Sequence, residues 1–320
     1  MASAFVSVAP LLTRRGACTL PAVTRQLRRT SRTCVGAAAS TMVDAAHSAA
    51  ATGLSTASIL PPAPPPSAPD AAGIVRHRPG DRFAQLLTHG GIAYLSGQVA
   101  TDTSVGVGAQ TSEVLAKVDA LLEEAGTSRE HLLTVTVYLA DVTTAPAMNE
   151  VWTTWLGDAA PRCTRATIGA PLVRPELLVE VVATAAIPPP VAPGPVATAS
   201  AAAAVGPYSQ GVVLEGGLVY VSGCVGLRSP ADGGGLVDGG VVPQTRQALA
   251  NMKAVLTAAG CSIADIVKTS IMVTDMGDFA TVNGVYSEVM GEAKPARACF
   301  GVAALPVGAV VEIECIAKQP

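Results

Sequence analysis

Two stretches of the chain repeat apolar residues at the spacing of an amphipathic helix. The apolar positions are Leu115, Val118, Leu122 and Ala125 in the first and Leu249, Met252, Leu256 and Ala259 in the second. Residues three and four apart lie on one face of a helix, so each stretch predicts a helix that buries one side. Glycine follows directly in both cases, at Gly126 and Gly260, and is a common signal for a helix end.

The two helical stretches belong to longer copies of one pattern. A shift of 134 positions superimposes several residue pairs: Gln110 on Gln244, Asp141 on Asp275, Asn149 on Asn283 and Trp152 on Tyr286. After a short loop the shift becomes 132 and superimposes two further pairs, Arg165 on Arg297 and Glu180 on Glu312. Self-similarity at a fixed period indicates a tandem duplication. We therefore expect two homologous domains, residues 71–187 and 196–320, joined by a proline-rich linker at 188–195.

Strand-like runs surround the predicted helices in both copies. In the second copy they are Ser209–Leu214, Leu218–Gly223, Ile266–Thr274, Ala296–Ala303 and Ala309–Ala317, with a shorter helix at Phe279–Val289. The matching strand and short helix of the first copy are Leu132–Ala140 and Ala145–Leu156. The resulting order, ββ-α-β-α-ββ, predicts an α+β fold in each copy. We expect one mostly antiparallel sheet with two helices on one face.

The first seventy residues have a different character. Residues 1–42 contain six arginines among Ser, Thr and Ala but no Asp or Glu, and they lack a compact apolar segment. This composition is typical of an organellar transit peptide rather than a secretory signal. An alanine-rich stretch and the prolines at 61–66 follow, which indicates a disordered Ala/Pro-rich linker. We expect delivery to the plastid, with the mitochondrion, or a merely basic tail, as alternatives.

Composition and charge argue against several classes of partner. The net charge is −3, so no excess of cations is present to neutralise the phosphates of a nucleic acid. Charged residues and prolines interrupt the apolar stretches before they reach the roughly 20 residues of a membrane span. The seven cysteines show no CxxC spacing, and all four histidines precede the second domain. We expect no nucleic-acid partner, no membrane span and no metal site.

The second domain contains motifs of a known family. They are Gly206-Pro207-Tyr208-Ser209-Gln210, Val221-Ser222-Gly223, Gln244-Thr245, Pro295-Ala296-Arg297 and Val311-Glu312-Ile313-Glu314. Together they resemble the reactive-intermediate (imine/enamine) deaminase family, also called RidA or YjgF-like. The first domain resembles the family more distantly, through Tyr94-Leu95-Ser96-Gly97-Gln98-Val99 and Thr164-Arg165-Ala166-Thr167. Arg82-Phe83-Ala84-Gln85 replaces the Gly-Pro-Tyr-Ser-Gln block there.

The resemblance implies a chorismate-mutase-like fold and a three-fold homo-oligomer with sites between neighbouring subunits. It implies hydrolysis of 2-imino and 2-enamino acids, such as 2-iminobutanoate and 2-iminopropanoate, to 2-keto acids and ammonia, without a cofactor. The expected partner is thus a small imino or keto acid. Two alternatives stay open: a non-catalytic ligand-binding or chaperone-like module of the same fold, and an endoribonuclease or translation inhibitor.

The chemistry of imine hydrolysis points to two residues. Arginine presents a planar fork of donors that can hold the substrate carboxylate, and Arg297 is the candidate for this anchor. Because the second domain has no histidine, a carboxylate must handle the protons, and Glu312 is the candidate base. Its choice over Glu314 rests on the family position. We expect two adjacent antiparallel strands to bring Arg297 and Glu312 into one cleft.

Further candidates complete the predicted site. Substrate-binding roles are expected for Tyr208, Ser222, Asn283 and Cys299, the last through its backbone groups. The first copy repeats the constellation as a possible second site with Arg165, Glu180 and Asn149. Ordinary structural roles remain open, such as a surface ion pair for Arg297. Neither copy matches the family completely, since Cys224 follows Gly223 and Phe83 stands at the place of Tyr208, so the copies share roles or differ in substrate.

Overall fold

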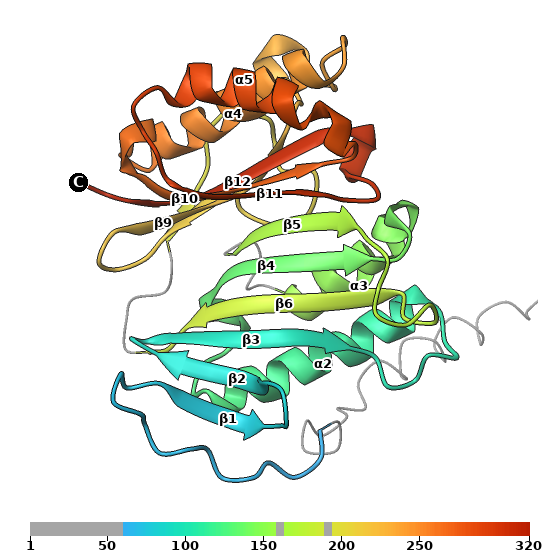
Figure 1. The fold of residues 1–320 in the computed structure, drawn as a ribbon. Helices are drawn as coiled ribbons and strands as arrows, with labels where there is room; N and C mark the ends of the chain where they lie inside the picture. The colour runs from blue at the N-terminus through green and yellow to red at the C-terminus, as the bar shows by residue number, and fades with distance from the viewer. Residues whose placement is uncertain (1–59, 158–162, 189–193) are drawn as a thin grey trace, which may run out of the picture. The chain divides into compact units, whose positions relative to one another are not determined.

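The computed structural model describes residues 60–157, 163–188 and 194–320. Residues 54–320 form one compact unit, which contains both predicted copies. The predicted transit peptide lies outside the described residues. Each copy forms its own six-stranded sheet, and the two sheets are the lower and upper parts of Figure 1. No helix within the described ranges is long and apolar enough to cross a membrane.

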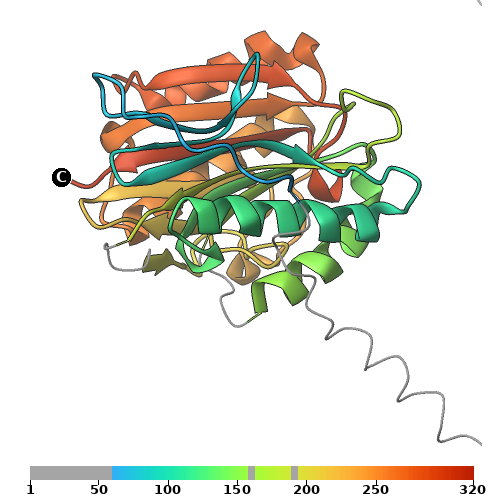
Figure 2. The same cartoon turned by 90° about the horizontal axis from the view of Figure 1, so that it is seen from below.

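The first copy builds its sheet in the order β1-β2-β3-β6-β4-β5. All neighbouring strands are antiparallel except β4 and β5, which are parallel and connected through α3. Figure 2 shows α2 and α3 side by side across the sheet. The elements are β1 (Val75–Pro79), β2 (Ala84–His89), β3 (Ile92–Val99), α2 (Val107–Glu124), β4 (Leu132–Leu139), α3 (Ala145–Leu156), β5 (Thr164–Gly169) and β6 (Val179–Ala186), with 3-10 turns η2 (Arg129–His131) and η3 (Val142–Thr144).

The second copy repeats this plan in the order β11-β10-β12-β9-β8-β7, with only β10 and β11 parallel. Its helices and strands are β7 (Gly194–Val196), β8 (Gly211–Val213), β9 (Leu218–Val225), α4 (Val241–Ala258), β10 (Ile266–Val273), α5 (Phe279–Met290), β11 (Ala296–Gly301) and β12 (Val311–Lys318). Its 3-10 turns are η5 (Pro230–Asp232), η6 (Ile263–Asp265), η7 (Met276–Asp278) and η8 (Pro306–Gly308). The predicted fold class is confirmed: two mostly antiparallel sheets, each with two helices.

Two details of the predicted organisation differ from the structure. Each copy begins with one more strand than expected, and the extra strand of the second copy, β7, starts at Gly194 inside the predicted linker. The strands of Arg297 and Glu312 are not neighbours, because β10 lies between β11 and β12. The expectation of an adjacent antiparallel pair is therefore wrong. A crossover through α5 places β11 parallel to β10 at the sheet edge, where a hairpin with β12 cannot form.

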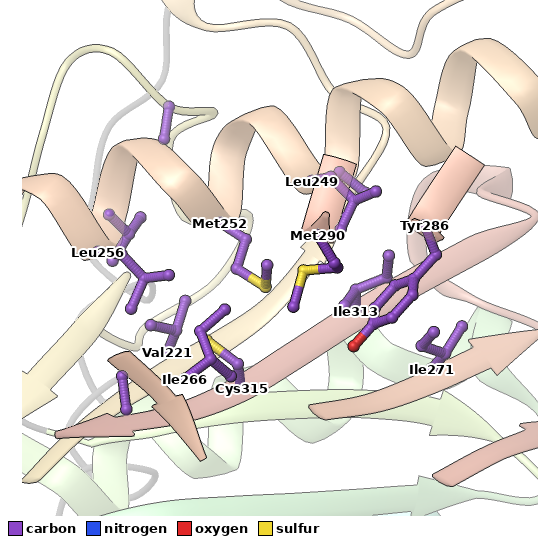
Figure 3. Packing of buried hydrophobic residues seen from close by; sticks show 14 of the residues in the cluster. Val221, Leu249, Met252, Leu256, Ile266, Ile271, Tyr286, Met290, Ile313 and Cys315 are labelled. Carbon is purple, nitrogen blue, oxygen red and sulfur yellow. The ribbon is translucent and has the colours of Figure 1, made fainter. Parts of the chain in front are cut away.

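The core of the second copy confirms the predicted helical face. Leu249, Met252 and Leu256 of α4 are fully buried against the sheet (Figure 3). Ile271 and Ile313 meet them from β10 and β12. Apolar surface removed from water contributes roughly 25 cal/mol per Å², so this layer holds helix and sheet together. The sheet thereby becomes a rigid support for side chains on its other face.

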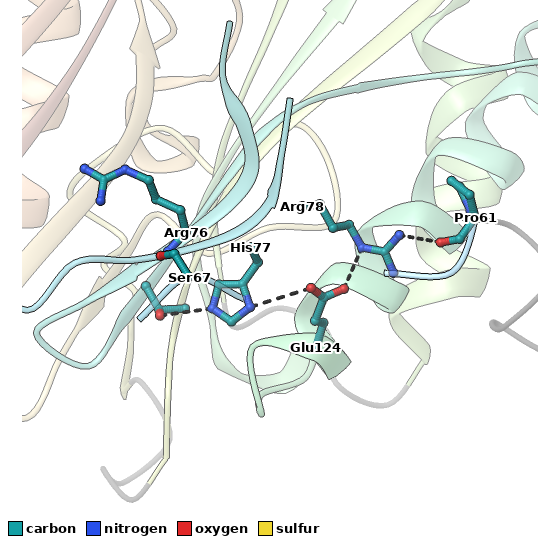
Figure 4. A network of polar contacts seen from close by, with 7 residues as sticks. Pro61, Ser67, Arg76, His77, Arg78 and Glu124 are labelled. Carbon is teal, nitrogen blue, oxygen red and sulfur yellow. Dashed lines mark hydrogen bonds and ion pairs between the residues drawn. The ribbon is translucent and has the colours of Figure 1, made fainter. Parts of the chain in front are cut away.

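Residues 60–70 already contact the first domain, before the predicted boundary at residue 71. Figure 4 shows Arg78 linking this segment to α2: it donates to the Pro61 carbonyl at 2.7 Å and to the Glu124 carboxylate at 2.6 Å. His77 lies on the other side of Glu124, with 3.6 Å between Nδ1 and Oε1. The backbone amide of Ser67 donates to the Arg76 carbonyl at 2.8 Å. Part of the segment predicted as a linker is thus held against the first domain.

The two copies contact each other through β5 and the second sheet. All six residues of β5 are buried, and β5 packs against β9. The Gly169 amide donates to the Ala304 carbonyl, and the Ala303 amide donates to the Gly169 carbonyl, both at 2.8 Å. A small apolar cluster containing Ile168 and Leu305 joins residues of both copies. This contact brings side chains of the first copy to the open face of the second sheet.

Candidate active site

Arg165 of the first copy is a buried cation that several side chains hold in place where the two copies meet. It lies on β5 and is only 4% exposed. Its Nη2 donates to Asn149 Oδ1 at 2.8 Å, and its guanidinium stacks on Trp152 and on Tyr208, 5.1 and 5.2 Å from the ring centres. Burial lowers the pKa of Arg165, but arginine remains charged at physiological pH. Nε and Nη1 have no hydrogen-bond partner among the described residues.

Glu312 of the second copy lies at the same contact. It is on β12, on the face away from the helices, and only 2% exposed. Burial is the main cause that raises the pKa of Glu312 to about 8, and nearby Glu314 adds to the rise while Arg165 opposes it. At neutral pH the group is therefore mostly protonated. Within the described residues Oε2 has no hydrogen-bond partner.

A glycine makes room for this carboxyl group. A Cβ atom on Gly223 of β9 would lie 1.7 Å from Glu312 Oε1, so no other residue fits there without moving the acid. The first copy repeats the arrangement, because a Cβ on Gly97 would lie 2.0 Å from Glu180 Oε1. In each copy the glycine of the Ser-Gly motif therefore leaves the space that a glutamate side chain occupies. Burial also raises the pKa of Glu180.

Ser222 and Tyr208, both in the second copy, contact Arg165 of the first copy. The Ser222 hydroxyl donates to the Ser209 carbonyl at 2.5 Å and accepts a hydrogen bond from the Arg165 amide at 3.1 Å. The Tyr208 hydroxyl accepts from the Val205 amide at 3.2 Å, and burial raises the pKa of Tyr208 to about 12. The ring of Tyr208 covers Arg165. The substrate-binding role predicted for Ser222 thus competes with a structural role that occupies its hydroxyl.

A pocket of about 530 Å³ opens between the two copies at these residues. Its polar wall consists of Thr143, Asn149, Arg165, Thr167, Tyr208 and Glu312. Its apolar wall includes Val142, Ala145 and Pro146 from the first copy and Val225, Leu305 and Val307 from the second. A cation and a protonatable acid therefore share one concave, mostly apolar site. This combination is typical of sites that bind small ligands.

The other predicted residues lie elsewhere. Arg297 is exposed on β11, where its Nη1 donates to Asn283 Oδ1 at 2.7 Å and its guanidinium lies 5.0 Å from the ring centre of Tyr286. Cys299 is half-buried on the same strand. None of these residues lines the pocket that contains Glu312. The structure brings Glu312 together with Arg165, the repeat equivalent of Arg297.

The duplication therefore produces matching halves of one site. We call Arg165, Asn149 and Trp152 the closed arginine half, and Arg297, Asn283 and Tyr286 the open arginine half. Glu312 with Gly223 is the closed acid half, and Glu180 with Gly97 is the open acid half. Within the unit of residues 54–320 the two closed halves meet in the pocket. The open halves lie on different copies and do not meet.

Two residues that contact Arg165 from outside the pocket wall, Trp152 and Gly206, had no role predicted from the sequence. Trp152 holds Arg165 and donates from its indole nitrogen to the Pro207 carbonyl at 3.0 Å. Gly206 is required because a Cβ there would lie 2.6 Å from Arg165 Nη2. For Trp152, the sequence signal that could have indicated a role was its alignment with Tyr286 in the repeat. Among the described residues no three His, Cys, Asp or Glu side chains gather as a metal site would require.

Comparison with known proteins agrees with the duplication. The family model described as Endoribonuclease L-PSP matches residues 74–187 and 198–319, together more than half of the chain. The chain belongs to this family and carries two of its domains in tandem. The resemblance noted in the sequence is thereby confirmed.

Similar proteins each correspond to one domain. The 2-iminobutanoate/2-iminopropanoate deaminase of Mus musculus is 48% identical over 124 residues, which is 39% of this chain and 90% of the relative. Protein mmf1, mitochondrial, of Schizosaccharomyces pombe is 45% identical over 36% of this chain and 69% of its own length. Reactive Intermediate Deaminase A, chloroplastic, of Arabidopsis thaliana is 45% identical, with 38% and 64% covered. A solved endoribonuclease L-PSP from Entamoeba histolytica is 44% identical, covers 40% of this chain and 99% of its own, and has a TM-score of 0.38.

Proposed function

We propose that the chain hydrolyses 2-imino and 2-enamino acids, such as 2-iminobutanoate and 2-iminopropanoate, to 2-keto acids and ammonia in the pocket between its copies. The observation that carries this proposal is the pairing of unpartnered groups in one buried space. Among the described residues, the Nε and Nη1 atoms of Arg165 keep N–H groups without a partner, and Glu312 keeps one carboxyl oxygen without a partner. Similar proteins that are named imine deaminases, each about the length of one domain, support the same activity.

The anchor for the substrate is Arg165. Its Nη2 is held by Asn149, and its guanidinium contacts the rings of Trp152 and Tyr208. Nε and Nη1, which have no partner among the described residues, lie on opposite sides of the guanidinium, so a bidentate contact to a carboxylate uses one of them together with the second N–H of Nη2. A bidentate arginine–carboxylate contact is stronger than a neutral hydrogen bond and also fixes orientation. The imine carbon next to that carboxylate is then held in one place relative to Glu312.

Glu312 moves the protons. In its protonated form it donates to the imine nitrogen, and the resulting carboxylate accepts a proton from water as the water oxygen bonds to C2. The carbinolamine nitrogen then takes the proton back from Glu312. The C–N bond breaks with its electron pair leaving on ammonia, and the hydroxyl proton returns to Glu312 as the keto acid forms. With an enamine the first proton goes to C3, which gives the same iminium carbon.

The division of labour between the copies follows from the pocket. The first copy supplies the cation and the second supplies the acid, so neither domain alone holds both groups. This differs from the sequence-based assignment of Arg297 and Glu312 to one site. We propose that Arg165 and Glu312 form the working pair within one chain, and that Tyr208 orients Arg165.

We also propose that the chain self-associates. Every residue of β5 is buried, whereas all residues of its counterpart β11 except Cys299 are exposed. A second chain that presents Glu180 and Gly97 to β11 would complete the open arginine half. Such a head-to-tail contact generates a ring or a filament, and the family resemblance favours a three-fold ring.

Delivery to the plastid completes the proposal. The acid-free, arginine-containing residues 1–42 support an organellar address. Similar proteins carry both a chloroplastic and a mitochondrial name. Fluorescence microscopy of the full chain fused at its C-terminus to a fluorescent protein, expressed in a photosynthetic cell, should show plastid signal. Fluorescence in mitochondria would instead support the mitochondrion as the location.

Four matched variants test the activity. Ammonia release from freshly generated 2-iminobutanoate should fall at least 100-fold in Arg165→Ala and in Glu312→Gln, because each loses one half of the closed pair. Their repeat equivalents, Arg297→Ala and Glu180→Gln, should keep the turnover of the pocket between the copies. The reverse pattern would assign the activity to the open halves. Keto-acid binding without any turnover by the unmodified chain would instead support the non-catalytic module.

A further inference from the structure

One hydroxyl in the pocket has no role in the steps above. Thr167 lies on β5 two residues after Arg165, and strand alternation directs both side chains to the same face. It lines the pocket together with Arg165 and Glu312. The residue is 7% exposed, and its Oγ1 is buried without a hydrogen-bond partner among the described residues. A buried hydroxyl normally has a partner, so an unpaired one in a ligand pocket marks a contact for the ligand.

The internal repeat shows how Thr167 differs from the equivalent residue of the second copy. The shift that superimposes Arg165 on Arg297 also superimposes Thr167 on Cys299. A thiol is a weak hydrogen-bond donor, whereas a hydroxyl both donates and accepts well. Cys299 lies on β11 in the open arginine half. The pocket that one chain completes by itself is therefore the one with the hydroxyl.

We propose that Thr167 is a third donor to the substrate carboxylate, beside the two N–H groups of Arg165. A carboxylate has about four acceptor positions on its two oxygens, so three donors fit. The inference rests on the proposed function and adds a residue that determines substrate affinity. Thr167 selects the carboxylate group of a 2-imino or 2-keto acid and takes no part in moving protons.

This role predicts a specific kinetic signature. The carboxylate is present in the substrate and in the transition state alike, so a donor to it strengthens both equally. Thr167→Val keeps the shape of the side chain and removes the hydroxyl. Its KM for 2-iminobutanoate should rise about tenfold, the loss expected for one hydrogen bond to a charged group, with kcat within about twofold of the unmodified chain. Thr167→Ser keeps the hydroxyl and should keep KM.

A matched control is available in the same sheet. Thr184 on β6 also has a buried Oγ1 without a partner among the described residues, but it is not part of the pocket wall. Thr184→Val therefore removes an equivalent hydroxyl from the same copy. Its KM should equal that of the unmodified chain. Circular dichroism and thermal melting of all variants check that each one folds.

A binding measurement separates this inference from the proposed function. The product 2-oxobutanoate carries the same carboxylate, so calorimetric titration of the full chain with it should show about tenfold weaker binding in Thr167→Val than in Thr184→Val. Equal binding and equal KM in these two variants would overturn the role of Thr167. A fall in kcat at unchanged KM would overturn it too. If the unmodified chain released no ammonia, the proposed function would fail, and the 2-oxobutanoate titration would still decide the inference.

Discussion

The backbone amide of Arg165 donates a hydrogen bond to the side-chain hydroxyl of Ser222 at 3.1 Å. This bond connects a strand of the first copy to a strand of the second, one residue away from the glycine that seats Glu312. The position of the cation therefore depends on the same strand, β9, that positions the acid. Changes at the contact between copies should affect catalysis even where they do not touch substrate.

Ser222→Ala should lower both stability and turnover. It removes the donor to the Ser209 carbonyl and the acceptor of the Arg165 amide, and the loss of these two hydrogen bonds costs about 2 kcal/mol of unfolding free energy. Urea unfolding and ammonia release measure the two effects. Ser96→Ala is the matched control, because the Ser96 hydroxyl donates to the Ala84 carbonyl at 2.7 Å and makes no bond to the second copy. Equal turnover in both variants would disprove the coupling.

Glu312 should make the protein less stable as pH rises. Burial raises its pKa from 4.5 to about 8, so the folded chain keeps a proton that the unfolded chain releases between these values. The stabilising contribution is complete below about pH 4.5 and is lost as pH rises through about 8. Urea unfolding between pH 5 and pH 8.5 should show a smaller slope for Glu312→Gln. Glu314, whose pKa burial also raises, leaves a residual slope of the same sign. Identical slopes in both proteins would contradict the buried acid.

The same proton should control activity. If protonated Glu312 is the donor to the imine, kcat/KM is constant at neutral pH and falls as pH rises through about 8, because this profile reports groups of the free enzyme. Steady-state rates across this range, corrected for spontaneous imine hydrolysis, measure it. A kcat/KM that increases through pH 8 would mean that the carboxylate, and not the acid, begins the reaction.

The sequence predicted the fold well because its evidence was local. Apolar spacing located the helices, and the repeat located the second copy, so Leu249 and Met252 lie in the core as expected. Strand order was harder to predict from the sequence, since it depends on contacts between residues that are far apart in the chain. The short connection after Arg297 favoured a hairpin with the strand of Glu312, but α5 carries the chain across to the sheet edge.

The composite pocket could not be derived from the repeat alone. Alignment showed that Arg165 and Arg297 are equivalent, and that Glu180 and Glu312 are equivalent, but not which arginine meets which acid. That choice depends on apolar packing between copies, such as Ile168 against the second copy, and on the backbone bonds between Gly169 and the 303–304 segment. Hydrophobic contacts of this kind leave no distinctive motif in the sequence.

Gly223→Ala should reduce turnover by at least tenfold, because a methyl group there would occupy the position of Glu312 Oε1 and displace the acid from the pocket. Ammonia release at saturating 2-iminobutanoate measures the effect, and circular dichroism checks the fold. Gly97→Ala places the same methyl group against Glu180 and should disturb only the open acid half. Equal losses in the two variants would show that the acid halves contribute alike.

Association of chains should depend on the exposed strand β11. Phe300 on this strand is 39% exposed, as is Val242 at the start of α4, so the two residues form a matched pair. Phe300→Asp should lower the mass measured by sedimentation equilibrium toward that of one chain, because a charge buried at an interface is costly unless it is paired. Val242→Asp should leave the mass unchanged, since an acidic side chain is favourable in the first turn of a helix. If both variants keep the mass of the unmodified protein, β11 is not the contact between chains, and the pocket of Arg165 and Glu312 must act alone.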